Sequence, residues 1–403
     1  MKSFTFHLPT KIIFGSNTEL EAPNEIKSLG FRRVLLHYGV GSAEKYGLIK
    51  RVIKSLEDGG LHVATLSGVQ PNPRLSLIRQ GIALCQKEGI DFVLAVGGGS
   101  VIDSAKAIAL GAANPDKNLW TDLILPRALT SDCLSVGTIL TIAAAGSEMS
   151  YNMTTTNDDD PENMIKTGYG NPLVRPRFSI LNPELTYTLP AYQTASGCAD
   201  IMMHSIERFL TATTGNEMSD QMAFAVLRTI VKYAPVALKQ PDNYQARSEI
   251  MWAGSISHNS LTNLGSTPCF PVHQLGHELS GKFDVAHGPS LTAVWGSWAR
   301  YVCKKISSTR FAELGARLFG MDSCGNQEMD AQWAIESLER FFSSIGMPVC
   351  LDELIGILPE EQLADMSIKC TRNKTKTIVG IYPLEHEDVL AIYRMANKHP
   401  GEI

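Results

Sequence analysis

The feature that most restricts the possible fold of this chain is a short apolar strand followed by a glycine-rich turn and a helix. Residues 92–96 are all apolar, Gly97 to Ser100 follow at once, and a helical pattern then runs to about Leu110. Strand patterns at 33–38 and 62–66 alternate with helical patterns in the same way. Such alternation is typical of a parallel sheet with helices on both faces. We therefore predict an α/β N-terminal domain built on a parallel, doubly wound sheet, preceded by short strands at 4–6 and 12–14 and closed by a strand at 178–181.

Three loops follow predicted strands, where sheets of this class bind ligands. These loops are Gly39 to Ser42, Pro71 to Pro73 and Gly97 to Ser100. The last combines bare backbone amides with the N-terminus of a helix, which suits a pyrophosphate. Its spacing is not the G-x-G-x-x-G of ordinary dinucleotide-binding folds. The alternative is a tight turn that packs helix on strand, and we favour phosphate binding.

Two further features concern the cofactor. Asp103 and Lys106 lie in the first turns of the helix after the glycines, where we expect them near a nicotinamide. The strand at 34–38 ends in Gly39-Val40-Gly41-Ser42, without the carboxylate that NAD-preferring sites place near the ribose 2′-hydroxyl. The absence favours NADP, unless the loop does not contact the ribose at all.

The second half of the chain shows helical patterns only. They cover 191–211, 218–238, 243–261, 291–303, 308–318, 330–345 and 385–396. We predict a dinucleotide-binding α/β domain over residues 1–185 and an all-α, metal-binding C-terminal domain over 186–403.

All five candidate metal ligands lie in this helical half. Asp200 and His204 are four residues apart and share a helix face. His273 and His277 have the same spacing, and His287 follows ten residues later. Five candidates exceed the three or four that a catalytic site needs, and spacing does not identify the spare one. The alternative is a buried polar network, and the number of candidates favours a metal.

Bulk properties exclude several classes of protein. The net charge of −5 gives no electrostatic case for nucleic acid or an anionic membrane. The N-terminus lacks the pattern of a secretory signal, no apolar run could span a bilayer, and the eight cysteines are scattered. We expect a cytoplasmic protein with reduced thiols.

Taken together, these motifs resemble the iron-containing (group III) alcohol dehydrogenase family, which shares its fold with dehydroquinate synthase. The resemblance covers essentially the whole chain. Within the family, the chain looks like the NADP-dependent butanol dehydrogenase and broad aldehyde reductase branch. It rests on GGGSVIDSAK at 97–106, Pro71-Asn72-Pro73, Gly146-Ser147-Glu148, NPELTYTLP at 182–190 and the Asp200…His204…His273…His287 spacing.

The resemblance implies specific roles. Asp200, His204, His273 and His287 would hold the metal, with Fe(II) expected first and Zn or another divalent ion as alternatives. His277 would act as a proton carrier. The implied cofactor contacts are Gly39, Ser42, Asn72, Gly97, Gly98, Gly99, Ser100, Asp103, Thr141 and Lys166.

The implied activity is reversible hydride transfer between NADP(H) and a short-chain alcohol or aldehyde such as butanol or butyraldehyde. A homodimer paired through residues 4–8 is also implied. Two departures stand out: Ala145 replaces a threonine common in relatives, and the loop at 158–161 resembles an insertion, which affects the placement of Lys166. Rival hypotheses are a glycerol dehydrogenase or dehydroquinate synthase-like enzyme, a metal hydrolase, and a non-catalytic nucleotide-binding module.

Overall fold

The computed structural model describes residues 1–161, 164–213, 215–267, 269–399 and 401. The chain divides into two compact units, neither of which is continuous in sequence. The α/β unit comprises His7–Pro190 and Gln240–Asn259, and the helical unit comprises Met1–Phe6, Ala191–Lys239 and Ser260–Ile403. The predicted domain boundary between residues 185 and 186 stays a prediction, but a single cut in the chain would not separate these units.

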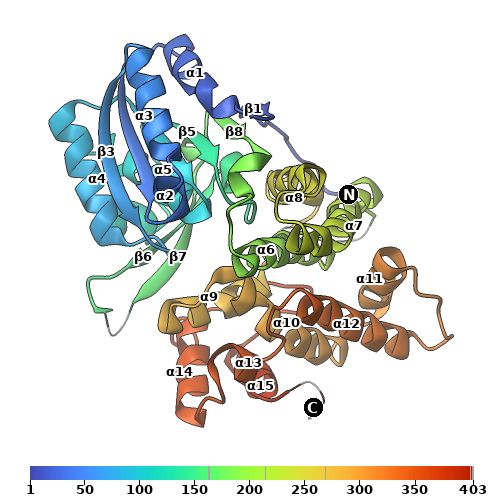
Figure 1. Ribbon diagram of the computed structural model, residues 1–403. Helices are drawn as coiled ribbons and strands as arrows, with labels where there is room; N and C mark the ends of the chain where they lie inside the picture. Colours follow the sequence, from blue (N-terminus) through green and yellow to red (C-terminus); the bar gives the residue numbers. More distant parts are fainter. Residues whose placement is uncertain (162–163, 214, 268, 400, 402–403) are drawn as a thin grey trace. The chain divides into compact units, whose positions relative to one another are not determined.

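A six-stranded, all-parallel sheet forms the centre of the α/β unit (Figure 1). Its strand order is β1-β8-β5-β4-β2-β3. The strands are β1 (Lys11–Phe14), β2 (Arg33–Gly39), β3 (His62–Val69), β4 (Phe92–Gly97), β5 (Ser135–Leu140) and β8 (Phe178–Leu181). The predicted fold class is confirmed, because strands and helices alternate as the sequence indicates.

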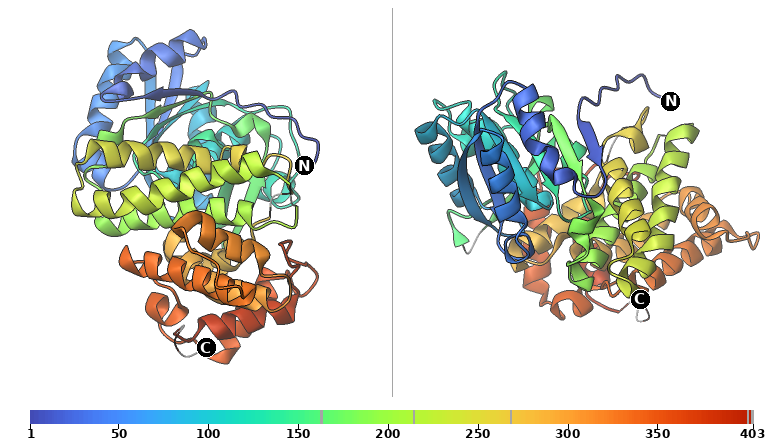
Figure 2. Two further views of the ribbon diagram at one scale, coloured as in Figure 1. Left: turned by 90° about the vertical axis from the view of Figure 1, so that its right-hand side faces the viewer. Right: turned by 45° about the horizontal axis from the view of Figure 1, so that its top comes forward.

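Helices cover both faces of this sheet. They are α1 (Ala22–Ser28), α2 (Ser42–Lys45), α3 (Leu48–Asp58), α4 (Leu75–Glu88) and α5 (Gly99–Ala112). Short helical turns lie at η1 (Thr18–Glu21), η2 (Leu119–Ile124), η3 (Ser147–Met149), η5 (Pro172–Val174) and η6 (Pro183–Thr186). Figure 2 (right view) shows α1 and α3, in blue, on the opposite side of the sheet from α4 and α5.

Strand β2 shows how the sequence produces these two layers. Alternate residues of a strand face opposite sides of the sheet. Val34 and Leu36 pack into the apolar cluster that includes Val52 of α3. Each such buried aliphatic side chain contributes roughly 1.5–3 kcal/mol. His37 points to the other face, where its ring contacts Ser104 of α5.

One helix of the α/β unit comes from far along the chain. Helix α8 (Tyr244–Ser257) packs against η6 and η3. The Ser255 hydroxyl donates to the Glu148 carboxylate at 2.5 Å, and burial raises the pKa of Glu148. A Cβ on Gly146 would lie 2.6 Å from the carbonyl oxygen of Gly254, so this approach requires glycine.

A two-stranded antiparallel hairpin also belongs to the α/β unit. It is formed by β6 (Asn152–Asn157) and β7 (Ile165–Gly170), and within the described chain neither pairs with a strand of the six-stranded sheet. The sequence patterns do not predict it, because threonine and glycine replace the usual apolar alternation. Asp158 to Asp160, most simply interpreted from the sequence as a solvated loop, follow β6 without regular structure, and Asp159 and Asp160 are exposed.

The helical unit contains the remaining helices. They are α6 (Ala191–Phe209), α7 (Glu217–Lys239), α9 (Pro271–Phe283), α10 (His287–Cys303), α11 (Thr309–Phe319), α12 (Gln327–Ser344), α13 (Leu351–Ile355), α14 (Glu360–Cys370) and α15 (His386–Ala396), with a short turn at η7 (Leu261–Asn263). Among the described residues, none of the helices combines the length and apolar character needed to span a membrane.

The strand predicted at residues 4–6 is wrong. Phe4 and Phe6 lie in a segment without regular structure, and both are exposed. A strand needs a hydrogen-bonded neighbour. The apolar alternation alone therefore misled the prediction.

Candidate functional site

Helix α6 places a carboxylate and an imidazole on one buried face. Asp200 and His204 are both about 4% exposed. Their four-residue spacing brings His204 Nδ1 to 3.4 Å from Asp200 Oδ1. Burying a carboxylate among apolar neighbours is costly unless a cation or donor faces it.

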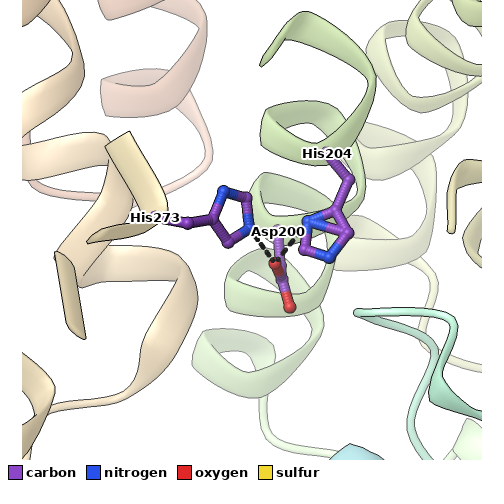
Figure 3. A group of neighbouring side chains, drawn as sticks. All are labelled: Asp200, His204 and His273. Atoms are coloured by element: carbon purple, nitrogen blue, oxygen red, sulfur yellow. Dashed lines mark ion pairs between the residues drawn. The ribbon is translucent and has the colours of Figure 1, made fainter. Parts of the chain in front are cut away.

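Helices α9 and α10 supply two more imidazoles to the same carboxylate oxygen. His273 Nε2 lies 3.7 Å from Asp200 Oδ1, and His287 Nε2 lies 3.8 Å from it. Figure 3 shows the rings of His204 and His273 pointing toward Asp200 from two helices. Three imidazole nitrogens thus converge on one oxygen.

This arrangement fits a divalent metal. Ligand atoms of Asp200, His204 and His273 lie within 4.8 Å of one another, the span of a coordination sphere. Within the described residues, Asp200 Oδ1 and His273 Nε2 are buried without a hydrogen-bond partner. Native proteins rarely leave such atoms unsatisfied, and a bound cation would satisfy both. Three nitrogens and one carboxylate suit Fe(II) or Zn.

Glu207 is a candidate functional residue that sequence reasoning missed. Its carboxylate accepts hydrogen bonds from Nδ1 of His273 and, at 2.6 Å, from the backbone N–H of Val272. The contact fixes the ring so that Nε2 faces Asp200, as outer carboxylates do in metal sites. The signal was available, because Glu207 follows Asp200 and His204 at seven and three residues on the same helix face.

His277 lies beside this group. It sits one turn after His273 on α9, is half-buried, and its ring centroid is 5.5 Å from that of His287. Spacing alone left five equivalent candidates. The geometry groups three imidazoles around Asp200 and leaves His277 next to His287.

The glycine-rich turn joins β4 to α5 in the α/β unit. A Cβ on Gly97 would lie 2.4 Å from Cγ2 of Val101, so packing alone requires glycine there. On Gly99, the first residue of α5, a Cβ would approach only Ala145, at 4.0 Å. Gly97 therefore fits the interpretation of this turn as a tight packing turn. The start of the helix at Gly98 to Ser100 is partly exposed, as a phosphate-binding turn requires.

The ammonium group of Lys106 is engaged by backbone carbonyls, which speaks against the expected place of this side chain beside a nicotinamide. Its side chain is fully buried, and Nζ donates to the carbonyls of Ser147, Ser150 and Asn152 at 2.7, 3.0 and 2.8 Å. Burial lowers the pKa of Lys106 to about 8. The ammonium instead holds the segment 147–152 together.

Asp103 is also tied to neighbouring backbone. Its carboxylate accepts from the Ser147 hydroxyl at 2.6 Å and from the Thr154 N–H at 2.8 Å. These bonds connect α5 to the hairpin. A direct contact of Asp103 with a cofactor stays a prediction.

The structure brings two other expected cofactor residues together. Lys166 of β7 donates to Asn72 Oδ1 at 2.9 Å, although the two lie far apart in sequence. Asn72 adopts a left-handed backbone conformation with φ 58°. Thr141 is buried, and its N–H donates to the Gly97 carbonyl at 3.1 Å. Gly39 ends β2, and the Ser42 side chain lies outside the described part of the structure.

Comparison with known proteins decides the family. Residues 9–183 match the family described as iron-containing alcohol dehydrogenase, and residues 194–397 match its C-terminal domain. The chain belongs to the iron-containing alcohol dehydrogenase family. The predicted family is therefore confirmed. Members are oxidoreductases that act on alcohols or aldehydes with a divalent metal and a nicotinamide cofactor.

Similar proteins come from several bacteria. The chain is 36% identical to the NADH-dependent butanol dehydrogenase A of Clostridium acetobutylicum, over 98% of this chain and 99% of that protein. It is 32% identical to an NADPH-dependent aldehyde reductase of Escherichia coli, covering 88% and 89%. The crystal structure of an NADH-dependent butanol dehydrogenase A from Thermotoga maritima matches with a TM-score of 0.92 and 33% identity, covering 99% of both chains.

Proposed function

We propose that this protein is a metal-dependent, NADP(H)-linked alcohol dehydrogenase that works reversibly as an aldehyde reductase on short-chain aliphatic substrates such as butyraldehyde. The observation that carries the proposal is the convergence of three imidazole nitrogens on Asp200 Oδ1, at 3.4 to 3.8 Å. The similarity to butanol dehydrogenases and an aldehyde reductase supports the substrate class.

The proposed metal ligands are Asp200, His204, His273 and His287, with Fe(II) as the ion. When bound, the ion supplies a Lewis acid at the substrate oxygen and the nicotinamide supplies or accepts the hydride. Glu207 keeps the proton of His273 on Nδ1, so that Nε2 offers a lone pair toward Asp200. His277 holds or accepts the proton exchanged with the substrate oxygen through a ring nitrogen, because imidazole titrates near neutral pH.

For the cofactor, we propose a preference for NADP(H). Support comes from residues 39–42, which offer no carboxylate to repel a 2′-phosphate. The names of relatives divide between NADH and NADPH, so the choice needs its own measurement. The residues proposed to contact the cofactor are Gly39, Ser42, Asn72, Gly97, Gly98, Gly99, Ser100, Asp103, Thr141 and Lys166.

A single assay with matched variants tests the reaction. Mixing the iron-loaded protein, NADPH and butyraldehyde should lower the absorbance at 340 nm, and NADH should give a smaller kcat/KM. Replacing His204 or His273 with alanine should abolish metal retention and turnover while NADPH still binds. Full turnover in the His204→Ala protein after chelation would refute the metal site, and a preference for NADH would refute only the cofactor assignment.

We also propose a cytoplasmic homodimer that pairs through residues 4–8. The exposed Phe4 and Phe6 side chains support an apolar contact there. Sedimentation of the intact chain and of a Phe4→Ser/Phe6→Ser variant tests this proposal, which requires the variant to dissociate at a higher concentration than the unmodified protein.

A further inference from the structure

The β6–β7 hairpin is hydrogen-bonded to the turn that precedes α4. The Thr156 N–H donates to the Pro73 carbonyl at 2.8 Å, and Arg74 forms a parallel β-bridge with Thr156. On β7, Lys166 is the cross-strand partner of Thr156 and donates to Asn72. Hairpin and turn therefore meet at the two residues that we propose to contact the cofactor.

Two carboxylates just after β6 add to this attachment. Asp158 accepts from the Ser76 N–H at 3.0 Å and from the Ser76 hydroxyl at 2.5 Å, in the first turn of α4. Asp159 pairs with both terminal nitrogens of Arg79 one turn later, at 2.5 and 3.0 Å. Asp158 thus binds at a helix N-terminus, where a negative charge is favoured.

The hairpin needs such contacts because it pairs with no other strand in the described residues. A two-stranded hairpin alone is marginally stable in water. Losing the contacts to α4 would let the ends of the two strands separate from the Pro73 turn. Lys166 would then spend less time next to Asn72.

We propose that Asp158 and Asp159 are positioning residues for cofactor binding, because they hold the β6–β7 hairpin against α4 and so keep Lys166 beside Asn72. The inference rests on the proposed contacts of Lys166 and Asn72 with the cofactor. Neither carboxylate touches the cofactor itself.

The direction in which each substitution changes NADPH affinity distinguishes this positioning role from a direct electrostatic effect of the removed charge. NADPH is an anion, so removing a nearby negative charge should strengthen its binding through space, whereas removing a positive charge should weaken it. The attachment predicts weaker binding in both cases. Asp159→Asn and Arg79→Gln therefore form a discriminating pair, and both side chains are exposed enough that the fold should tolerate the changes.

The experiment measures NADPH affinity by the change in its fluorescence, together with KM and kcat in the butyraldehyde assay. Asp159→Asn and Arg79→Gln should each raise the dissociation constant by roughly threefold, the size expected for one exposed bidentate ion pair. The kcat at saturating NADPH should stay within about twofold, because Lys166 still reaches its place once the cofactor is bound. Metal content should not change.

Three further comparisons complete the experiment. Exchanging the charges in an Asp159→Arg/Arg79→Asp double variant should restore affinity if the contact itself matters. Asp58→Asn removes a comparable exposed ion pair with Lys54 on α3 and should leave NADPH binding unchanged. In a Lys166→Ala background, Asp159→Asn should cause no additional loss.

The possible results distinguish a failure of the positioning role from a failure of the proposed function. Unchanged or tighter NADPH binding in Asp159→Asn, with normal binding in the unmodified protein, would overturn the positioning role. Failure of the charge exchange to restore affinity would do the same. If the unmodified protein bound neither NADPH nor NADH, the proposed function would fail instead.

Discussion

The carboxylate of Glu207 accepts a hydrogen bond from Nδ1 of His273, while Nε2 of the same ring lies 3.7 Å from Asp200 Oδ1. Glu207 therefore sets the tautomer of a proposed metal ligand. We predict that Glu207→Gln weakens Fe(II) or Zn binding by roughly 10- to 100-fold, the range seen for outer-shell partners. Metal retained after dialysis against a weak chelator measures this. Glu217→Gln, on the exposed start of α7, is the control. Equal retention in both variants would contradict the assigned role.

Alanine substitutions at two glycines of the β4–α5 turn should have different effects, one on stability and the other on nucleotide binding. Gly97→Ala places a methyl group 2.4 Å from Val101 and should destabilise the α/β unit by about 1–3 kcal/mol. Gly99→Ala meets nothing closer than 4.0 Å and should change stability by less than about 0.5 kcal/mol. It should still weaken NADPH binding by roughly tenfold, because a pyrophosphate needs close approach to this backbone. Thermal melting and NADPH fluorescence distinguish the two effects; normal NADPH affinity in Gly99→Ala would show that the phosphates bind elsewhere.

His37 should make the α/β unit sensitive to acid. Its Nδ1 donates to the Leu66 carbonyl at 2.9 Å, its Nε2 lies 2.8 Å from the Ser104 hydroxyl, and burial lowers its pKa to about 4. The unfolded chain binds a proton near pH 6.5 and the folded chain does not, so stability falls as the pH drops from 6.5 toward 4. Between pH 7 and pH 5 the loss from this group should be about 2 kcal/mol. Comparing urea unfolding of the unmodified protein and His37→Gln at both pH values isolates it, and an identical loss in both proteins would exclude His37 as the cause.

Lys106 should be required for stability. Its buried ammonium donates to three backbone carbonyls and to the Ser147 hydroxyl. Lys106→Met would leave these acceptors without their charged donor, and we expect a loss of about 3 kcal/mol or more. Lys54→Met, on exposed α3, should change stability by less than about 1 kcal/mol. Differential scanning calorimetry measures both, and comparable melting temperatures would show that water replaces the Lys106 ammonium.

Part of the cluster of candidate metal ligands could be predicted, because the period of a helix relates the spacing of residues in the sequence to their positions on the helix surface. Four-residue spacing places Asp200 and His204 on one face of α6 without further information. Which histidines join them depends on how α9 and α10 pack against α6, and that is not a local property. The geometry supplies this missing step and adds Glu207, whose buried charge could have been noticed from its place on the same helix face.

The β6–β7 hairpin could not be predicted for a related reason. Its strands carry Thr154, Thr155 and Thr156 opposite Lys166 to Gly168, so the apolar alternation that marks a strand is weak. Contacts with α4 and α5 stabilise it instead. Conversely, residues 4–6 have the alternation but no strand to pair with. Local pattern therefore predicted the central sheet well and the edges of the fold poorly.

The assignment of α8 to the α/β unit has a practical consequence for protein engineering. The chain passes from one compact unit to the other after Phe6, Pro190, Lys239 and Asn259. A fragment that stopped at residue 190 would keep the buried Glu148 but lose Ser255, the hydroxyl that donates to it. A chimera that exchanges the α/β units between relatives must therefore carry residues 240–259 with the N-terminal portion.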